Sequence, residues 1–132
     1  MKKRGNLSVA MAAAAFGTGL VALAAASSPA LAHHSFAMFD QTKILNAKGT
    51  ISEFHWTNPH SFIVVDVKTG ATTTRYVLEC NSTNMMTRAG WKVNTVKPGD
   101  AVGITYYPLR TGKPGGMLKT VTLADGKTLS AW

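Results

Sequence analysis

The sequence contains a single cysteine, Cys80, so no disulfide bond can form within the chain. It also lacks the Cys-x-x-Cys-His pattern of haem attachment, the paired Cys-x-x-Cys of structural zinc sites and the His-Glu-x-x-His of zinc proteases. No histidine follows His60, which excludes the Cys, His and Met pattern of a cupredoxin. We expect Cys80 to be a buried apolar thiol; a soft metal ligand and an intermolecular bridge are the alternatives.

Patterns typical of enzymes are missing as well. No glycine-rich loop opens a helix, and neither Ser35 nor Ser61 stands in a nucleophile elbow. The six acidic residues are dispersed, so no carboxylate pair is indicated. We therefore expect a protein without catalytic activity.

The N-terminus has the three parts of a secretory signal peptide. Basic residues at 2–4 precede an apolar, alanine-rich run over about 7–26, and Ala30 and Ala32 occupy the small-residue positions of a cleavage site. The alternative is a retained anchor, but Pro29 and the Ala-Leu-Ala box favour cleavage after Ala32. We expect export by the Sec route to the periplasm, with no stable membrane insertion after cleavage.

The charge pattern agrees with a soluble exported domain. Fourteen Lys and Arg stand against six Asp and Glu, and the net charge is +8. After residue 33 the basic residues are spaced singly, which is typical of a solvated surface. Binding to nucleic acid or to an anionic envelope surface is the weaker alternative, and because we expect export we expect no nucleic-acid partner.

The mature chain predicts one small domain after a short arm. We expect a docking arm over 33–44 and a barrel over 45–132. Alternation and turn residues predict strands over 45–57, 62–67, 73–79, 102–107 and 117–123, with a short helix that begins after 81 or 82 and ends at Gly90. This order favours an all-β, five-stranded OB-like barrel with one short helix between strands 3 and 4; a small β-sandwich is the alternative.

Two histidines flank a predicted turn at residues 54–62. Asn58 and Pro59 favour a tight turn between two strands, which places His60 at or just past the corner with an accessible ring. His55 alternates with aromatic neighbours that face the core, so we expect it to point outward. A break in alternation between 51 and 54 predicts a bulge.

The predicted cleavage would give His33 a free α-amine beside its own imidazole. Both groups can give up their protons at modest cost near neutral pH, and a further imidazole from His34, His60 or His55 would complete a three-nitrogen site suited to Cu(II). Cleavage one residue earlier would instead place His34 third, in a square-planar site for Cu(II) or Ni(II). The alternative is that the His-His pair is only the polar end of a docking arm and that His60 caps its turn.

Soft donors for Cu(I) are present in Met85, Met86 and Cys80, but methionines at helical spacing are more typical of a core. We expect both methionines to be buried.

A second interpretation needs no metal. OB-like barrels often bind extended ligands through aromatic and basic side chains. This chain offers Trp56, Phe62, Tyr76, Arg75, Tyr107 and Arg110, beside Tyr106. The ligand would be a small envelope glycan or peptide, or a protein partner in the periplasm. The alternative is that most of these aromatics fill the barrel.

Several motifs together resemble a known family. They are Ala-His-His-Ser-Phe-Ala-Met-Phe-Asp after the signal, Gly-Thr-Ile-x-x-Phe-x-Trp-Thr-Asn-Pro-His, Gly-Trp at 90–91, and Lys-Pro-Gly-Asp before a strand. The mature chain resembles a family of small exported bacterial proteins of unknown function. The family pattern contains His33, His34, Asn58, Pro59 and His60, whereas Cys80 and the Met85-Met86 pair depart from it. The resemblance implies export and assigns no activity.

Overall fold

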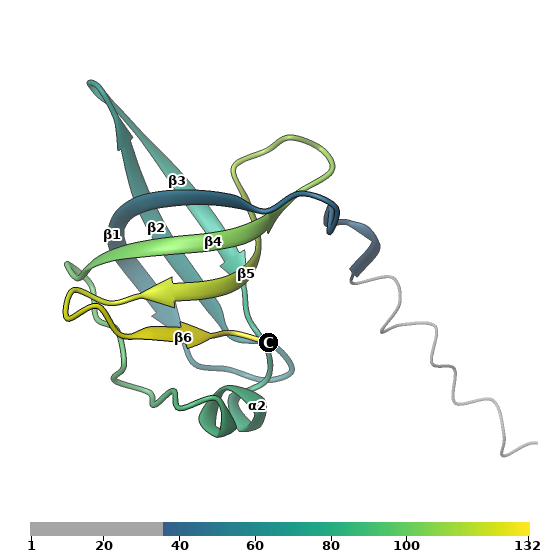
Figure 1. Ribbon diagram of the computed structural model, residues 1–132, viewed down its shortest axis with the longest axis vertical. Helices are drawn as coiled ribbons and strands as arrows, with labels where there is room; N and C mark the ends of the chain where they lie inside the picture. Colours follow the sequence, from purple (N-terminus) through teal and green to yellow (C-terminus); the bar gives the residue numbers. More distant parts are fainter. Residues whose placement is uncertain (1–35) are drawn as a thin grey trace, which may run out of the picture.

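The computed structural model describes residues 36–132. The predicted signal peptide, His33 and His34 lie outside this range. The described elements are β1 (Leu45–His55), β2 (Phe62–Thr69), β3 (Thr72–Glu79), α2 (Thr83–Arg88), β4 (Ala101–Pro108), β5 (Gly115–Thr122) and β6 (Thr128–Ser130), as labelled in Figure 1.

The strands form a closed barrel. They follow the order β3-β2-β1-β4-β5-β6, and an additional parallel pairing of β3 with β5 closes the ring. The expected five-stranded OB-like barrel with α2 between β3 and β4 is thus confirmed. The closing segment after Asp125 and Gly126 forms an extra strand, β6, which pairs with β5 alone.

The predicted irregularity in β1 is present. The register against β2 shifts between Ile51 and Glu53, as a β-bulge does. After the shift, Phe54 packs against the core, while the side chains of Glu53 and His55 are about half exposed, at 47% and 52%. The bulge therefore decides which residues of β1 face solvent.

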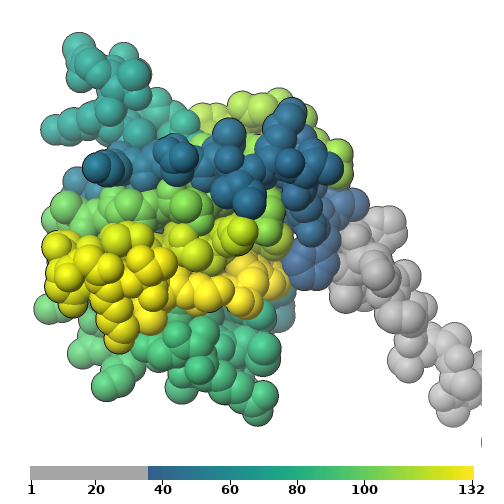
Figure 2. Space-filling model, viewed as in Figure 1, coloured from purple at the N-terminus to yellow at the C-terminus, as the bar shows by residue number. Residues whose placement is uncertain are grey.

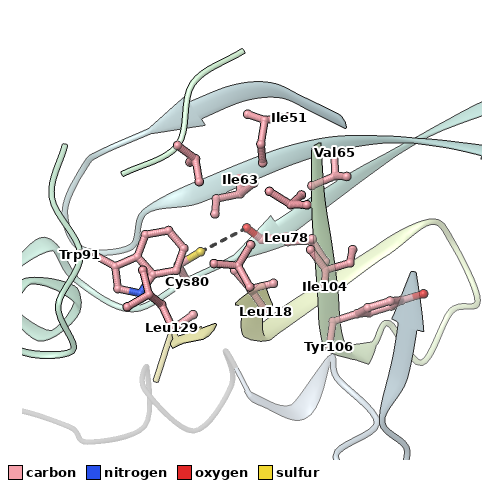
Figure 3. Packing of buried hydrophobic residues seen from close by; sticks show 14 of the residues in the cluster. Ile51, Ile63, Val65, Leu78, Cys80, Trp91, Ile104, Tyr106, Leu118 and Leu129 are labelled. Atoms are coloured by element: carbon pink, nitrogen blue, oxygen red, sulfur yellow. Dashed lines mark hydrogen bonds between the residues drawn. The ribbon is translucent and has the colours of Figure 1, made fainter. Parts of the chain in front are cut away.

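Side chains from every strand meet in one core (Figure 3). Trp91 is among its largest members, and its Nε1 donates a hydrogen bond to the Ser130 carbonyl over 2.7 Å. Cys80 is fully buried, as predicted, and burial raises the pKa of its thiol. Met86 is also fully buried, but the prediction for Met85 was wrong: it is 46% exposed, because so short a helix turns only one face toward the barrel.

The β2–β3 hairpin extends beyond the barrel body. Pairing of β1 with β2 begins at Asp66, and β5 meets β3 only from Val77 onward. Among the described residues, those of β2 and β3 from Val67 to Thr74 therefore pair only with each other. Figure 2 shows this teal tip standing out from the surface. Among residues 36–132, none of the helices has the length and hydrophobicity needed to cross a membrane.

Candidate metal site around His60

The turn that carries His60 is held by hydrogen bonds on both sides. Ser61 donates its N–H to the Asn81 carbonyl and accepts from the Cys80 N–H at its own carbonyl, over 3.0 and 2.8 Å. The hydroxyl of Thr57 donates to the carbonyl of His60 over 2.9 Å. The backbone at His60 is therefore tied to the segment that follows β3.

Asn58 connects the same turn to α2. Its Oδ1 accepts hydrogen bonds from the backbone N–H and the hydroxyl of Thr83, both at 3.0 Å. Thr83 opens α2, whose N-cap is Ser82. In the Asn-Pro-His sequence, Asn58 thus satisfies a donor at the start of the helix and ties the turn that carries His60 to α2.

The imidazole of His60 is paired with a carboxylate. Its Nδ1 lies against Oε1 of Glu79, the last residue of β3, and the two side chains are 29% and 13% exposed. The register that places Phe62 opposite Glu79 brings the two side chains together. A carboxylate that fixes one ring nitrogen is the usual second partner of a metal-binding histidine.

An aromatic stack joins His60 to the arm. Trp132 meets the ring of His60 edge to face, with centroids 5.6 Å apart, and it meets the ring of Phe36 in the same way at 5.3 Å. Phe36 is the first residue that the structure describes. Phe36 and His60 therefore both contact the same side chain, that of Trp132.

The arm is fastened to the end of β4 just beyond this stack. The Asp40 N–H donates to the Pro108 carbonyl over 2.8 Å, and the Arg110 N–H donates to the Met38 carbonyl over 2.9 Å. The guanidinium of Arg110 also donates to the Ala37 carbonyl over 3.0 Å. These bonds fix the path of the arm from Ala37 to Asp40 along the end of β4.

His55 lies outside this arrangement. As predicted, it points outward, and its Nε2 is 2.7 Å from Oε2 of Glu53. Arg75 lies beside it, ion-paired with Glu53 and Asp66. The structure thus places His60 beside the arm and His55 in an exposed charged cluster.

His33 and His34, the histidines of the predicted mature N-terminus, lie outside the described residues. Within residues 36–132, no group of three or more His, Cys, Asp or Glu side chains is arranged to hold a metal ion.

The aromatic and basic residues of the metal-free interpretation are distributed over several places. Trp56 packs on Phe54, Tyr76 on Tyr106, and Tyr107 lies under the ammonium of Lys119. Arg75 and Arg110 are engaged as described above. Phe62 lines a cavity of about 170 Å³ with Met38, Phe39, Val77, Glu79, Leu109, Pro114 and Gly116.

Sequence reasoning missed three features. Glu79 and Trp132 gave no signal, because their contacts with His60 depend on strand register and on the path of the chain after β6. The third is an apolar groove of about 530 Å³ along β1, β4 and the end of β5. Its only signal was the alternation of small residues at Ala47 and Gly49 and at Ala101 and Gly103.

Comparison with known proteins decides the family. A family model described as "Family of unknown function (DUF6152)" matches residues 20–119. The chain belongs to this family. Membership in DUF6152 assigns no activity, so the site must be interpreted from its own chemistry. No curated protein and no solved structure matches the chain.

Proposed function

We propose that this DUF6152 protein is exported to the periplasm and binds copper there through its processed N-terminus and His60. The observation that carries the proposal is that the ring of Trp132 contacts both the ring of Phe36 in the arm and the ring of His60. This stack brings the arm to the one described histidine that is paired with a largely buried carboxylate.

The reach of the chain supports this assignment. His33 stands three positions before Phe36, and three residues span at most roughly 10 Å when extended. Phe36 and His60 are both in contact with Trp132. A terminal residue at 33 is therefore within chain reach of the His60 ring.

The donor types suit Cu(II). A terminal amine, the imidazole of the same residue and a second imidazole form a nitrogen-rich set, which copper prefers over calcium or magnesium. His34 is the next candidate donor, and His55 is the last because its ring lies with Glu53 in the exposed cluster.

The test is calorimetric titration of Cu(II) into protein whose N-terminus is verified as His33 by intact mass. We expect one tightly bound ion per chain, and loss of that binding in His33→Ala and in His60→Ala. His55→Ala is the matched control and should bind as the unaltered protein does. A version with three extra non-histidine residues before His33 displaces the amine without placing a histidine at the third position, and it should bind far more weakly.

Equal, weak binding in all of these proteins would overturn the copper proposal. The metal-free alternative would then gain, with a small envelope ligand or protein partner at the cavity that Phe62 and Val77 line. Its apolar lining favours a ligand with an apolar group of matching size.

A further inference from the structure

Two carboxylate–histidine pairs in this protein use opposite ring nitrogens. Glu79 lies against Nδ1 of His60, whereas Glu53 lies against Nε2 of His55. An ionised carboxylate can only accept hydrogen bonds, so each contacted nitrogen carries the proton. In the neutral ring, the other nitrogen then keeps its lone pair.

We propose that Glu79 is a positioning residue that holds His60 in the Nδ1–H form and so presents Nε2 as the metal donor. This inference rests on the proposed function, because it names the nitrogen through which His60 would bind copper. Without a partner, a neutral imidazole exchanges between its two tautomers. A carboxylate at Nδ1 removes that exchange and orients the ring before the metal arrives.

Burial makes Glu79 effective in this role. Its side chain is 13% exposed, so water competes little for the carboxylate, and a hydrogen bond to a charged acceptor is stronger than one between neutral groups. The partner is fixed as well, since the carbonyl of His60 accepts from Thr57 and the rings of His60 and Trp132 are in contact.

With Glu79 at Nδ1, Nε2 is the ring nitrogen of His60 that remains for a metal ion. Nδ1 is the ring nitrogen nearer the backbone, and Glu79 occupies it. Nε2 lies across the ring, at its outer end. A metal ion bound at Nε2 would therefore not need to displace Glu79.

The His55–Glu53 pair provides a control within the same molecule. Its carboxylate and ring are 47% and 52% exposed, and it takes no part in the aromatic stack. Glu53→Leu removes a carboxylate from a histidine just as Glu79→Leu does. Only the latter should affect the proposed site.

The first test needs no metal. Long-range ¹H–¹⁵N correlation NMR of the metal-free protein distinguishes the tautomers of each histidine from the shifts of its ring nitrogens. We expect His60 in the Nδ1–H form in the unaltered protein and in a tautomer mixture in Glu79→Leu. Glu79→Gln keeps an acceptor of nearly the same shape and should largely retain the Nδ1–H form, which separates positioning from a general loss of folding.

The second test is Cu(II) titration of the same proteins. Loss of a second partner of this kind weakens metal binding about 10–100-fold, and we expect that decrease in Glu79→Leu, a smaller one in Glu79→Gln and none in Glu53→Leu. An Nε2–H form of His60 in the unaltered protein, or an unchanged tautomer in a folded Glu79→Leu protein, would overturn the inference. Absence of copper binding in the unaltered protein would overturn the proposed function, whereas the metal-free tautomer would still test Glu79 on its own.

Discussion

The ring of Phe36 meets the ring of Trp132 edge to face, with their centroids 5.3 Å apart. This contact is where the arm joins the candidate site, because Trp132 also contacts His60. Aromatic pairs of this kind contribute about 0.5–1.5 kcal/mol beyond the area that they bury. The contact therefore makes a modest but measurable contribution to how well the terminus is placed.

Phe36→Ala should weaken copper binding by up to about tenfold without abolishing it, because the donors remain while the arm loses its anchor. Titration followed by Trp fluorescence and calorimetry measures the change. Met38→Ala is the control on the same arm, since Met38 is 49% exposed. Equal effects of the two substitutions would contradict a specific role for the aromatic contact.

Asn58→Ala should destabilise the protein by about 1–2 kcal/mol, because two donors of Thr83 lose their acceptor at the start of α2. Asn58→Asp retains an acceptor at the same place and should cost much less. Denaturant unfolding measures both. If the two variants are equally destabilised, the hydrogen bonds to Thr83 are not the reason for the asparagine.

Gly115→Ala should cost about 3 kcal/mol or more, because an added Cβ would lie 2.5 Å from the carbonyl oxygen of Val77 where β5 pairs with β3, at a φ of +125°. Gly112→Ala is the matched control in the preceding loop. Its φ is +75° and nothing lies within 4 Å of the added atom, so only the left-handed conformation is penalised, by about 1–2 kcal/mol. Thermal and denaturant unfolding compare the two, and similar losses would mean that closure tolerates a side chain at Gly115.

We expect the buried thiol of Cys80 to make the folded protein less stable at alkaline pH. Burial raises the pKa of its thiol above the ordinary value of 9.0, so above about pH 9 the unfolded chain loses this proton while the folded protein keeps it. The unfolded state then binds fewer protons, and the free energy of unfolding falls by up to about 1.4 kcal/mol per pH unit.

Unfolding of Cys80→Ala between pH 7 and pH 10.5 measures the contribution of the thiol. We expect the variant to lose less stability over this range than the unaltered protein. Burial also raises the pKa of Tyr106, which acts in the same direction in both proteins and so cancels in the comparison. Parallel curves for the two proteins would show that Cys80 does not cause the slope.

Local patterns predicted most of the fold. Alternation and turn residues indicated the strands, and the break after Ile51 indicated the bulge, because both depend on which side chains face the core. The length of β2 was underestimated, since the hairpin continues to Thr69 through polar residues that carry no alternation. Met85 was misassigned because spacing within so short a helix does not say which face meets the barrel.

The candidate site was only partly predictable. Asn58 and Pro59 predict a turn, and the position of His60 directly after them marked this histidine as a candidate site residue. Its contacts with Glu79 and Trp132 join residues that are far apart in the chain. No local pattern contains such contacts, so they became visible only in the folded barrel.

The aromatic stack has a consequence for how the folded chain is held together. It unites the beginning of the described chain, the β1–β2 turn, the end of β3 and the segment after β6 at one place. A metal ion held there by His33 and His60 would act as a cross-link in a protein that has no disulfide, closing one long loop of chain. Copper would then raise the melting temperature of the entire barrel, and removal of the metal would lower it again.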